Sequence, residues 1–434
     1  MQYYSTNGNS PKVSLQEAVI HGLASDKGLF MPEVIPTIPK AFFNNIAEMS
    51  LQDIAYVVAN TLFGQDVESE TLKQIVNETL NFDIPLVLVS ENRYSLELFH
   101  GPTLAFKDVG ARFMARLLGY FNKEKGKRDI NVLVATSGDT GSAVANGFLN
   151  VPGVRVFVLY PRGKVSKIQE AQFTTLGANI TALEVNGTFD DCQALVKNAF
   201  IDKDLNEKMQ LTSANSINVA RFLPQMFYYF YAYAQLARMG KPLDNIVISV
   251  PSGNFGNITA GLIGKRMGLP IKRFIAANNR NDIFFQYLLT GIYSPRPSIA
   301  TIANAMDVGA PSNFARILDL YEQSHDAIAS EISGCTYTDE EIAETLKETY
   351  DKTGYLLDPH GAVGYRSLLE NLKENEIGIF LETAHPAKFK DTVEGIIQNE
   401  VKIPNKLSEF MKGTKSTVKM SSAFPAFKKY LMNV

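Results

Sequence analysis

One lysine stands where its amine could do covalent chemistry. Lys107 follows the turn signal Gly101-Pro102 in the stretch from Phe99 to Asp108. Thr103 is a good N-cap, and apolar residues recur after it at helical spacing, which predicts a helix that opens near Thr103 with Lys107 in about its second turn. The helix dipole and nearby aromatic rings disfavour an ammonium, and a neutral amine can form an imine. Lys107 is therefore a candidate to hold a cofactor aldehyde; a solvated lysine is the alternative.

Small hydroxyl residues and glycines follow the apolar run 131–135, from Thr136 to Ser142, and a helix is predicted over 143–149. Such a loop directs N–H and O–H donors toward one point, which is how a carboxylate or a phosphate is held. The candidate anion ligands are Thr136, Ser137 and Thr140. A capped turn without a ligand is the alternative.

Two further polar stretches could hold phosphate. Residues 251–257 follow an apolar run and precede a helical pattern, and Gly253 and Gly256 free the backbone to approach a ligand. The stretch is neither a Walker loop nor G-x-G-x-x-G, which favours a phosphorylated group smaller than a nucleotide. Asn215, Ser216 and Arg221, ahead of an aromatic helix predicted over 222–236, could form a second anion site or could simply cap that helix.

The last apolar run, 377–381, leads to Thr383 and His385. Thr383 can present a hydroxyl to a cleft, whereas His385 before a proline is expected to cap or fill space rather than to catalyse. The histidines show no H-E-x-x-H pattern and the cysteines lack metal-ligand spacing, so no metal site is expected. A G-x-S-x-G elbow for acyl transfer is also missing from the sequence.

The elements that must position these residues are six nearly continuous apolar runs, at 131–135, 154–159, 179–185, 246–250, 274–277 and 377–381. Such runs, separated by helical patterns, are typical of strands buried on both faces in a parallel, doubly wound α/β architecture. Ligands bind beyond the carboxyl ends of such strands. Residues 1 to about 94 are predicted to be mostly helical, with a capping box from Ser14 to Glu17 and helices over 51–63 and 68–80.

The composition favours a small-molecule partner. The 434 residues are 45% hydrophobic and 20% charged, with a net charge of −3 and the two signs interspersed, which argues against nucleic acid or an anionic membrane as a partner. Cys192 and Cys335 lie far apart, as suits a reducing compartment. The amino terminus lacks a basic flank followed by an apolar core, and no window approaches a membrane span, so we expect a cytoplasmic protein.

These stretches together resemble the fold type II pyridoxal-phosphate enzymes and, within them, the threonine synthase family. The resemblance lies in residues 100–108, 135–142, 215–221, 253–257 and 383–386, and the opening from Tyr3 to Pro32 resembles that family's amino-terminal domain, so it covers nearly the whole chain. It implies two doubly wound parallel-sheet domains and a mostly helical N-terminal domain. The implied boundaries are 1–94 for the N-terminal domain, 95–225 for the smaller domain with the cofactor lysine, and 226–434 for the larger domain.

The resemblance also implies a reaction and its cofactor. O-phospho-L-homoserine and water would give L-threonine and phosphate on pyridoxal 5'-phosphate held by Lys107, which would also act as the base at Cα. The cofactor would further contact Asp139, Gly253, Asn254, Phe255, Gly256, Asn257 and Thr383. The substrate would contact Thr136, Ser137 and Thr140 through its carboxylate, and Asn215, Ser216 and Arg221 through its phosphate. Related loops often carry asparagine where this chain has Asp139.

Other functions remain possible on the sequence alone. A related lyase would turn O-phospho-L-homoserine into 2-oxobutyrate, and a dehydratase of serine and threonine would share the same core. A protein that kept the fold only to bind a metabolite is a further alternative, against which Lys107 argues. An α/β sugar-phosphate enzyme without a cofactor would leave Lys107 unexplained. By resemblance, the molecule is expected to be a monomer or a homodimer.

Overall fold

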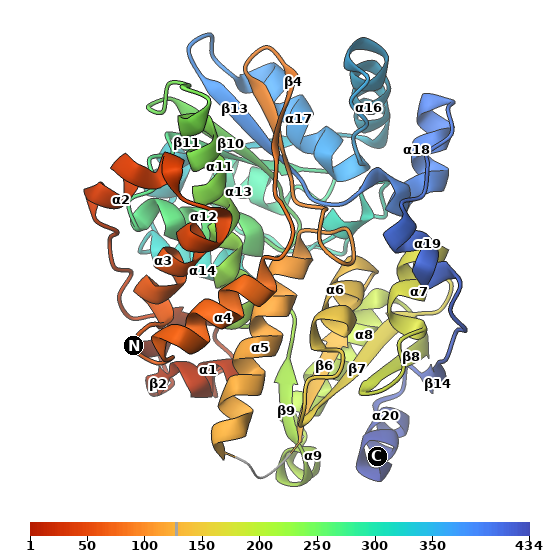
Figure 1. Ribbon diagram of the computed structural model, residues 1–434. Helices are drawn as coiled ribbons and strands as arrows, with labels where there is room; N and C mark the ends of the chain where they lie inside the picture. Colours follow the sequence, from red (N-terminus) through yellow and green to blue (C-terminus); the bar gives the residue numbers. More distant parts are fainter. Residues whose placement is uncertain (126–128) are drawn as a thin grey trace. The chain divides into compact units, whose positions relative to one another are not determined.

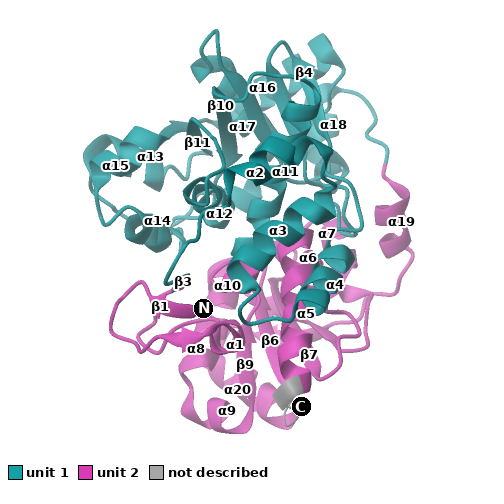
Figure 2. Cartoon of the chain, turned by 60° about the vertical axis from the view of Figure 1, so that its left-hand side comes forward, with its two compact units in different colours: residues 1, 31–106, 222–402 teal, residues 2–30, 107–221, 403–434 magenta. Residues whose placement is uncertain are grey.

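The computed structural model describes residues 1–125 and 129–434, and its backbone groups into two compact units (Figures 1 and 2). Unit 1 comprises Met1, 31–106 and 222–402, and unit 2 comprises 2–30, 107–221 and 403–434. Each unit therefore draws on separate stretches of the chain. The division into 1–94, 95–225 and 226–434 stays a prediction about domains.

Unit 1 is built on a six-stranded sheet with the order β12-β11-β10-β13-β5-β4. Neighbouring strands are parallel except for the antiparallel pair β4 and β5. The two strands in the middle of the sheet, β10 and β13, are buried along their whole length, as their largely apolar sequences predict. The strands are β4 (Leu86–Ser90), β5 (Arg93–Glu97), β10 (Ile246–Pro251), β11 (Arg273–Asn278), β12 (Ile332–Thr336) and β13 (Ile377–Glu382).

Helices of unit 1 surround this sheet, and α17 packs on β10, β11 and β13. Before the sheet come α2 (Lys40–Asn45), η1 (Ile46–Glu48), α3 (Leu51–Phe63) and α4 (Ser69–Thr79). Between and after its strands come η2 (Leu223–Gln225), α11 (Met226–Arg238), α12 (Gly256–Arg266), α13 (Ile283–Thr290), η3 (Asn304–Met306), α14 (Phe314–Leu320), α15 (His325–Glu331), α16 (Asp339–Thr353), α17 (Pro359–Asn371), η4 (Pro386–Phe389) and α18 (Lys390–Ile397).

Unit 2 is built on a five-stranded parallel sheet with the order β14-β8-β7-β6-β9. Its strands are β6 (Ile130–Ala135), β7 (Val154–Pro161), β8 (Ile180–Asn186), β9 (Gln210–Ser213) and β14 (Val418–Ser421). Two short strands of unit 2, β1 (Gln2–Ser5) and β2 (Val13–Ser14), pair antiparallel. A further short strand, β3, is Phe30–Pro32.

One hydrophobic cluster of unit 2 joins the sheet to helices from the middle and the end of the chain. Cys192 and Leu195 of α8 (Phe189–Ile201) and Phe427 and Leu431 of α20 (Phe424–Asn433) belong to the same buried cluster as Leu133 of β6. The remaining helices are α1 (Leu15–His21), α5 (Lys107–Lys125), α6 (Asp139–Phe148), α7 (Lys167–Thr174), α9 (Lys203–Lys208), α10 (Val219–Phe222) and α19 (Asn405–Met411).

The structure confirms the predicted class, with parallel sheets built from all six predicted strands, and it confirms the helices α3 and α4. The capping box at Ser14 and Glu17 is also present at the start of α1. Further strands that the sequence analysis did not predict complete the two large sheets around these six: β9, β12 and β14, together with the β4–β5 hairpin in the region expected to be helical.

Two helices that follow strands of the unit 2 sheet start at other residues than predicted. The helix expected over 143–149 begins at Asp139, because Gly138 takes φ +145° and turns the chain directly out of β6. The helix expected over 222–236 begins as α10 and η2 and becomes regular only at Met226, because Pro224 lacks an N–H for the helical ladder.

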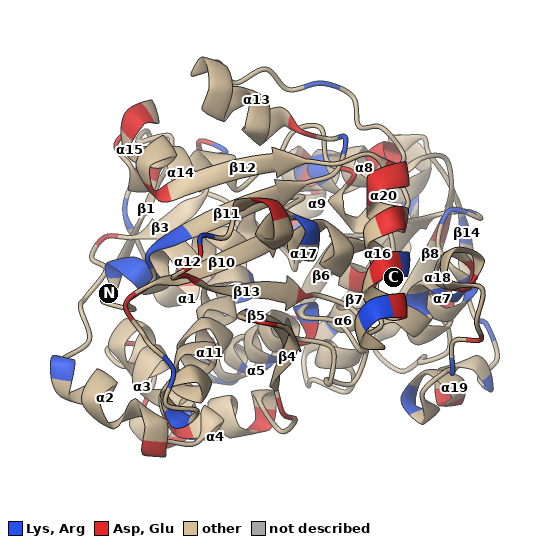
Figure 3. Cartoon of the chain, turned by 90° about the horizontal axis from the view of Figure 1, so that it is seen from above, with Lys and Arg blue, Asp and Glu red and all other residues tan. Residues whose placement is uncertain are grey.

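Acidic residues and basic residues are both spread over many elements of the chain (Figure 3). The acidic first turn of α16, Asp339, Glu340 and Glu341, suits the positive end of that helix. Among the helices described, none is both long enough and apolar enough to cross a membrane.

Candidate functional site

The segment that leads into Lys107 is an extended stretch paired with the chain just after β13. Phe106 N donates to Thr383 O at 2.9 Å, His385 N donates to Leu104 O at 3.1 Å, and Ala105 forms an antiparallel bridge with Ala384. Leu104 takes φ +56°, in the left-handed region that favours glycine, to allow this pairing.

The helix predicted to open near Thr103 therefore begins at Lys107 itself, which is a correction to the sequence analysis. Backbone groups of 104–106 bond to 383–385 and so are not available for a first helical turn. Lys107 is the first residue of α5, at the positive end of the helix dipole, so the dipole acts on its amine from the first turn.

Arg221 lies beside the backbone of this helix start in unit 2. Its Nη1 donates to Lys107 O at 3.1 Å, and its side chain is buried. Burial lowers the pKa of Arg221 to about 10, and Asp108 opposes that shift, so the guanidinium stays charged at neutral pH. The carbonyl of Arg221 also lies against Gly110, where a Cβ would come within 2.2 Å of the oxygen.

The loop after β6 is folded around the Thr136 hydroxyl. Thr136 Oγ1 accepts from Gly138 N at 2.9 Å and from Gly141 N at 2.8 Å. The hydroxyl thus stabilises the start of α6. Ser137 and Thr140, by contrast, are partly exposed at that helix N-terminus.

Asp139 is buried in the first turn of α6 and has a partner that the sequence analysis did not foresee. Gln169 Nε2 donates to Asp139 Oδ1 at 2.9 Å, and the Gln169 side chain fills the space where a Cβ at Gly138 would lie, 2.5 Å from its Cδ. Because the contact uses an acceptor oxygen, a carboxylate fits this position without a proton.

Asn215 is tied to the end of β6, since its Nδ2 donates to Ala135 O at 3.2 Å. Strands β6 and β9 are neighbours in the sheet, which brings the residues after β9 next to the loop after β6. Ser216 is partly exposed in the same turn. Within unit 2, the predicted residues Thr136, Asn215 and their neighbours therefore gather at the carboxyl ends of two adjacent strands.

Residues 252–257 of unit 1, named here the phosphate loop, connect β10 to α12. Phe255 takes φ +62° as the residue before the helix, and Gly253 lies so close to Met306 that a Cβ would come within 2.8 Å of Met306 Cα. Asn254 Oδ1 accepts from Ser312 N at 2.6 Å. The loop is thus fixed by backbone contacts and ends at the positive end of an eleven-residue helix.

Asn257 supplies the clearest sign of a ligand in this loop. Its Oδ1 accepts from Tyr228 Oη at 2.6 Å and from Tyr229 Oη at 2.8 Å, while its Nδ2 is buried without a hydrogen-bond partner. A buried donor left unpaired is costly unless a ligand satisfies it. A phosphate group fits here, because its oxygens would accept from Asn257 Nδ2 and from the N–H groups at the start of α12.

Thr383 follows β13, is buried, and accepts from Phe106 N through its carbonyl. His385 lies two residues on, and its Nδ1 accepts from Ala387 N at 3.1 Å, which confirms the predicted capping role. Burial, together with the neighbouring His100, lowers the pKa of His385 to about 4, so the ring is neutral at pH 7.

The predicted residues fall into one group in each unit. Unit 1 holds the phosphate loop and Thr383, and unit 2 holds Lys107, the loop after β6, and Asn215, Ser216 and Arg221. Sequence reasoning missed Gln169, Tyr228, Tyr229, Asp358 and His360, which bond to these residues or to their neighbours. The Asp-Pro-His-Gly stretch 358–361 was the one available signal, since Asp before Pro marks a helix start.

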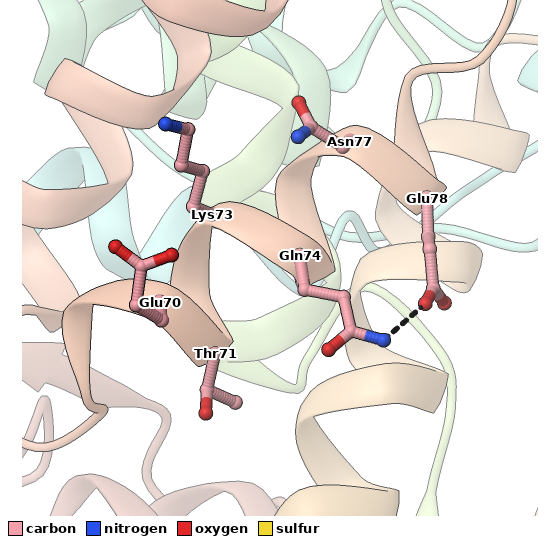
Figure 4. Close-up of a pocket in the computed structure, with 6 residues that line it drawn as sticks. All are labelled: Glu70, Thr71, Lys73, Gln74, Asn77 and Glu78. Atoms are coloured by element: carbon pink, nitrogen blue, oxygen red, sulfur yellow. Dashed lines mark hydrogen bonds between the residues drawn. The ribbon is translucent and has the colours of Figure 1, made fainter.

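A surface depression lies on α4 (Figure 4). It is lined by Glu70, Thr71, Lys73, Gln74, Asn77 and Glu78, and Gln74 Nε2 donates to Glu78 Oε1 at 2.7 Å. These residues come from a single helix and include none of the predicted site residues, so we assign no function to it.

Comparison with known proteins identifies the class of the protein. The family model described as "Pyridoxal-phosphate dependent enzyme" matches residues 94–380. The fold and this match together define a pyridoxal-phosphate-dependent enzyme of fold type II. Models described as "Threonine synthase N terminus" and "Threonine synthase, C-terminal" match residues 2–80 and 361–431. The chain belongs to the threonine synthase family.

Individual relatives match over the full length. Threonine synthase from Haemophilus influenzae is 45% identical over 432 residues, covering 100% of both chains. The crystal structure of threonine synthase from Escherichia coli has a TM-score of 0.92 at 41% identity and covers 100% of both chains. A pyridoxal-phosphate-bound threonine synthase from Brucella melitensis has a TM-score of 0.93 at 35% identity and covers 100% of this chain and 99% of the other.

Proposed function

We propose that this enzyme converts O-phospho-L-homoserine and water into L-threonine and inorganic phosphate. The observation that carries the proposal is the full-length likeness to threonine synthases at up to 45% identity, which includes the amino- and carboxyl-terminal segments named for that family. The small-molecule substrate of the enzyme would accordingly carry a phosphate of its own, in addition to that of the cofactor.

The cofactor would be held at three places. Lys107 would bind it covalently through its amine, the phosphate loop would hold its phosphate through Asn257 Nδ2 and the N–H groups of α12, and the Thr383 hydroxyl would contact its ring nitrogen. When bound, pyridoxal phosphate supplies an electron sink for the negative charge that develops on the substrate. Because a threonine hydroxyl is neutral, it leaves the ring less protonated than a carboxylate would.

The remaining residues would bind substrate and move protons. Thr140 and Ser137, partly exposed at the start of α6, would hold the carboxylate with the loop built around Thr136. Asn215, Ser216 and Arg221 would hold the phosphate that leaves. The amine of Lys107 would take the Cα proton once substrate is bound and would return a proton later in the turnover.

A product analysis tests this function. Protein loaded with pyridoxal phosphate is incubated with O-phospho-L-homoserine, and threonine, 2-oxobutyrate and phosphate are quantified, with Lys107→Ala as the control. Threonine equal to phosphate, and absent in the control, is expected. Formation of 2-oxobutyrate in place of threonine would assign the lyase reaction, and release of no phosphate would overturn the proposal.

Two further points belong to the proposal. Both cysteines, Cys192 and Cys335, are buried and unpaired, which supports a reducing compartment such as the cytoplasm. A monomer or a homodimer is proposed as the functional state, to be measured by sedimentation.

A further inference from the structure

A buried pair of side chains, Asp358 and His360, begins α17 in unit 1. Asp358 is fully buried and His360 is 2% exposed. Asp358 Oδ1 accepts from His360 N at 2.6 Å, as an N-cap does, and lies 2.5 Å from His360 Nδ1. Neither residue belongs to the cofactor or substrate contacts assigned above.

The aspartate reaches the segment that carries Thr383. Ala384 N donates to Asp358 Oδ2 at 3.3 Å, and Ala384 is the residue that forms the bridge with Ala105. The two oxygens of the carboxylate thus bind different partners, since Oδ1 binds His360 and Oδ2 holds the chain directly after Thr383.

The histidine bonds to backbone that lies against the phosphate loop. His360 Nε2 accepts from Ala305 N at 3.1 Å, and Ala305 O would lie 3.0 Å from a Cβ at Gly253. Since Nε2 accepts a hydrogen bond, the ring proton is on Nδ1, where it donates to Asp358. The imidazole is therefore held in one tautomer, and it bonds to the backbone that packs against Gly253.

Glu382, the last residue of β13, completes this buried group. Asp358 N donates to Glu382 Oε1 at 2.6 Å, and Glu382 Oε2 occupies the place of a Cβ at Gly361, which would lie 1.6 Å away. Burial and the neighbouring Asp358 carboxylate raise the pKa of Glu382 well above its usual range, with Glu97 adding to the effect. The raised pKa favours the neutral acid at Glu382, and the neutral form avoids charge repulsion with Asp358.

We infer that Asp358 and His360 are positioning residues that hold the Thr383 segment and the phosphate loop at a fixed separation, so that one cofactor meets both. The inference rests on the proposed function, which assigns both parts to pyridoxal phosphate. It concerns hydrogen bonds to Ala384 and Ala305 rather than any direct contact of the pair with the cofactor.

Two substitutions of one residue separate the two bonds of the imidazole. His360→Gln places an amide oxygen where Nε2 lies and keeps an acceptor for Ala305 N, whereas His360→Asn keeps only a donor toward Asp358. Thr338→Ala is the matched control, because Thr338 caps α16 of the same unit without any bond to the site. The affinities for pyridoxal phosphate and for pyridoxal, which lacks the phosphate, are measured by absorbance titration of each apoprotein.

His360→Asn is expected to weaken pyridoxal phosphate binding by about tenfold, the worth of one buried hydrogen bond, and pyridoxal binding by less than about threefold. His360→Gln keeps the acceptor for Ala305 N but loses the donor to Asp358, so it should weaken pyridoxal phosphate binding less than His360→Asn does. Thr338→Ala should bind both compounds as the parent does. Asp358→Asn, which can no longer accept with both oxygens, should shift the absorption maximum of the bound cofactor.

Two outcomes would overturn the inference in favour of a purely structural role. One is that His360→Asn and His360→Gln lose equal affinity for pyridoxal phosphate. The other is that His360→Asn loses equal affinity for pyridoxal and for pyridoxal phosphate. A matching loss in Thr338→Ala would also overturn the inference. A parent protein that binds pyridoxal as tightly as pyridoxal phosphate would instead contradict the assignment of the phosphate loop in the proposed function.

Discussion

A single hydrogen bond indicates what the candidate site requires at Asp139. Gln169 Nε2 donates to Asp139 Oδ1 at 2.9 Å. An asparagine would offer the same carbonyl acceptor to Gln169. At this position, therefore, the acceptor oxygen matters more than the charge.

The first prediction follows from this contact. Asp139→Asn should retain appreciable activity, because its Oδ1 still accepts from Gln169. Gln169→Glu should lower kcat/KM by about tenfold or more, because it removes the donor and sets two buried carboxylates against each other. Steady-state threonine formation is the measurement, and thermal unfolding shows whether each variant is folded.

The double variant Asp139→Asn with Gln169→Glu is the control. It restores one donor and one acceptor across the contact and should recover part of the activity that Gln169→Glu loses. Complete loss of activity in Asp139→Asn, or a Gln169→Glu enzyme equal to the parent, would contradict this account.

Among the elements, helix α5 packs closely against the backbone of another segment at one of its glycines, Gly110. A Cβ at Gly110 would meet Arg221 O at 2.2 Å, whereas a Cβ at Gly119 of the same helix would meet only Val151 Cγ1 at 3.3 Å. The contact at Gly110 places α5 against the backbone of the residue whose guanidinium holds Lys107 O. The position of Lys107 therefore depends on the absence of a side chain one turn later.

The two glycines form a matched test. Gly110→Ala should lower the free energy of unfolding by about 1–3 kcal/mol through overpacking against rigid backbone, and should lower activity with it. Gly119→Ala should change stability by less than about 1 kcal/mol, because alanine favours the helix and the Val151 side chain can shift. Urea unfolding of both variants is the measurement, and equal effects would contradict the packing argument.

The sequence predicted the elements well where the apolar pattern was unbroken, as in β6, β7 and β10. It failed where tertiary pairing overrides local preference: Thr103 is a good N-cap, yet 104–106 pair with 383–385 and the helix begins at Lys107. The candidate residues after the strands could be named from residue type alone. Their partners Gln169 and Tyr228 come from other parts of the chain and carry no local signal, and only the Asp-Pro step at 358–359 marked the place of His360.

For the whole molecule, the main feature is that unit 2 is assembled from three separate stretches of sequence. Its last stretch, 403–434, supplies the edge strand β14 and the buried residues Met420, Phe427 and Leu431 of the cluster around α8. The five-stranded sheet of unit 2, from which the loop after β6 extends, therefore needs β14 from residues 403–434 as its edge strand.

Truncation after Lys402 tests this dependence. The shortened protein loses β14 beside β8 and exposes the apolar surface that α20 covers, so unit 2 should be strongly destabilised. Loss of cooperative thermal unfolding and of cofactor binding is expected, with removal of Val434 alone as the control. A truncated protein that melts like the full chain would contradict this role of 403–434.

The carboxyl group of Glu382 fills the space beside the Gly361 backbone in which a side chain at position 361 would lie. This constrains the order in which substitutions at the two positions can arise. A side chain at position 361 would collide with Glu382 Oε2, so the buried glutamate would have to move to accept such a substitution. A smaller residue at 382 would relieve the collision, but it would leave a cavity until position 361 filled it. Positions 361 and 382 should therefore change together across lineages, because a protein with only one of the two substitutions is less stable than a protein with neither or with both.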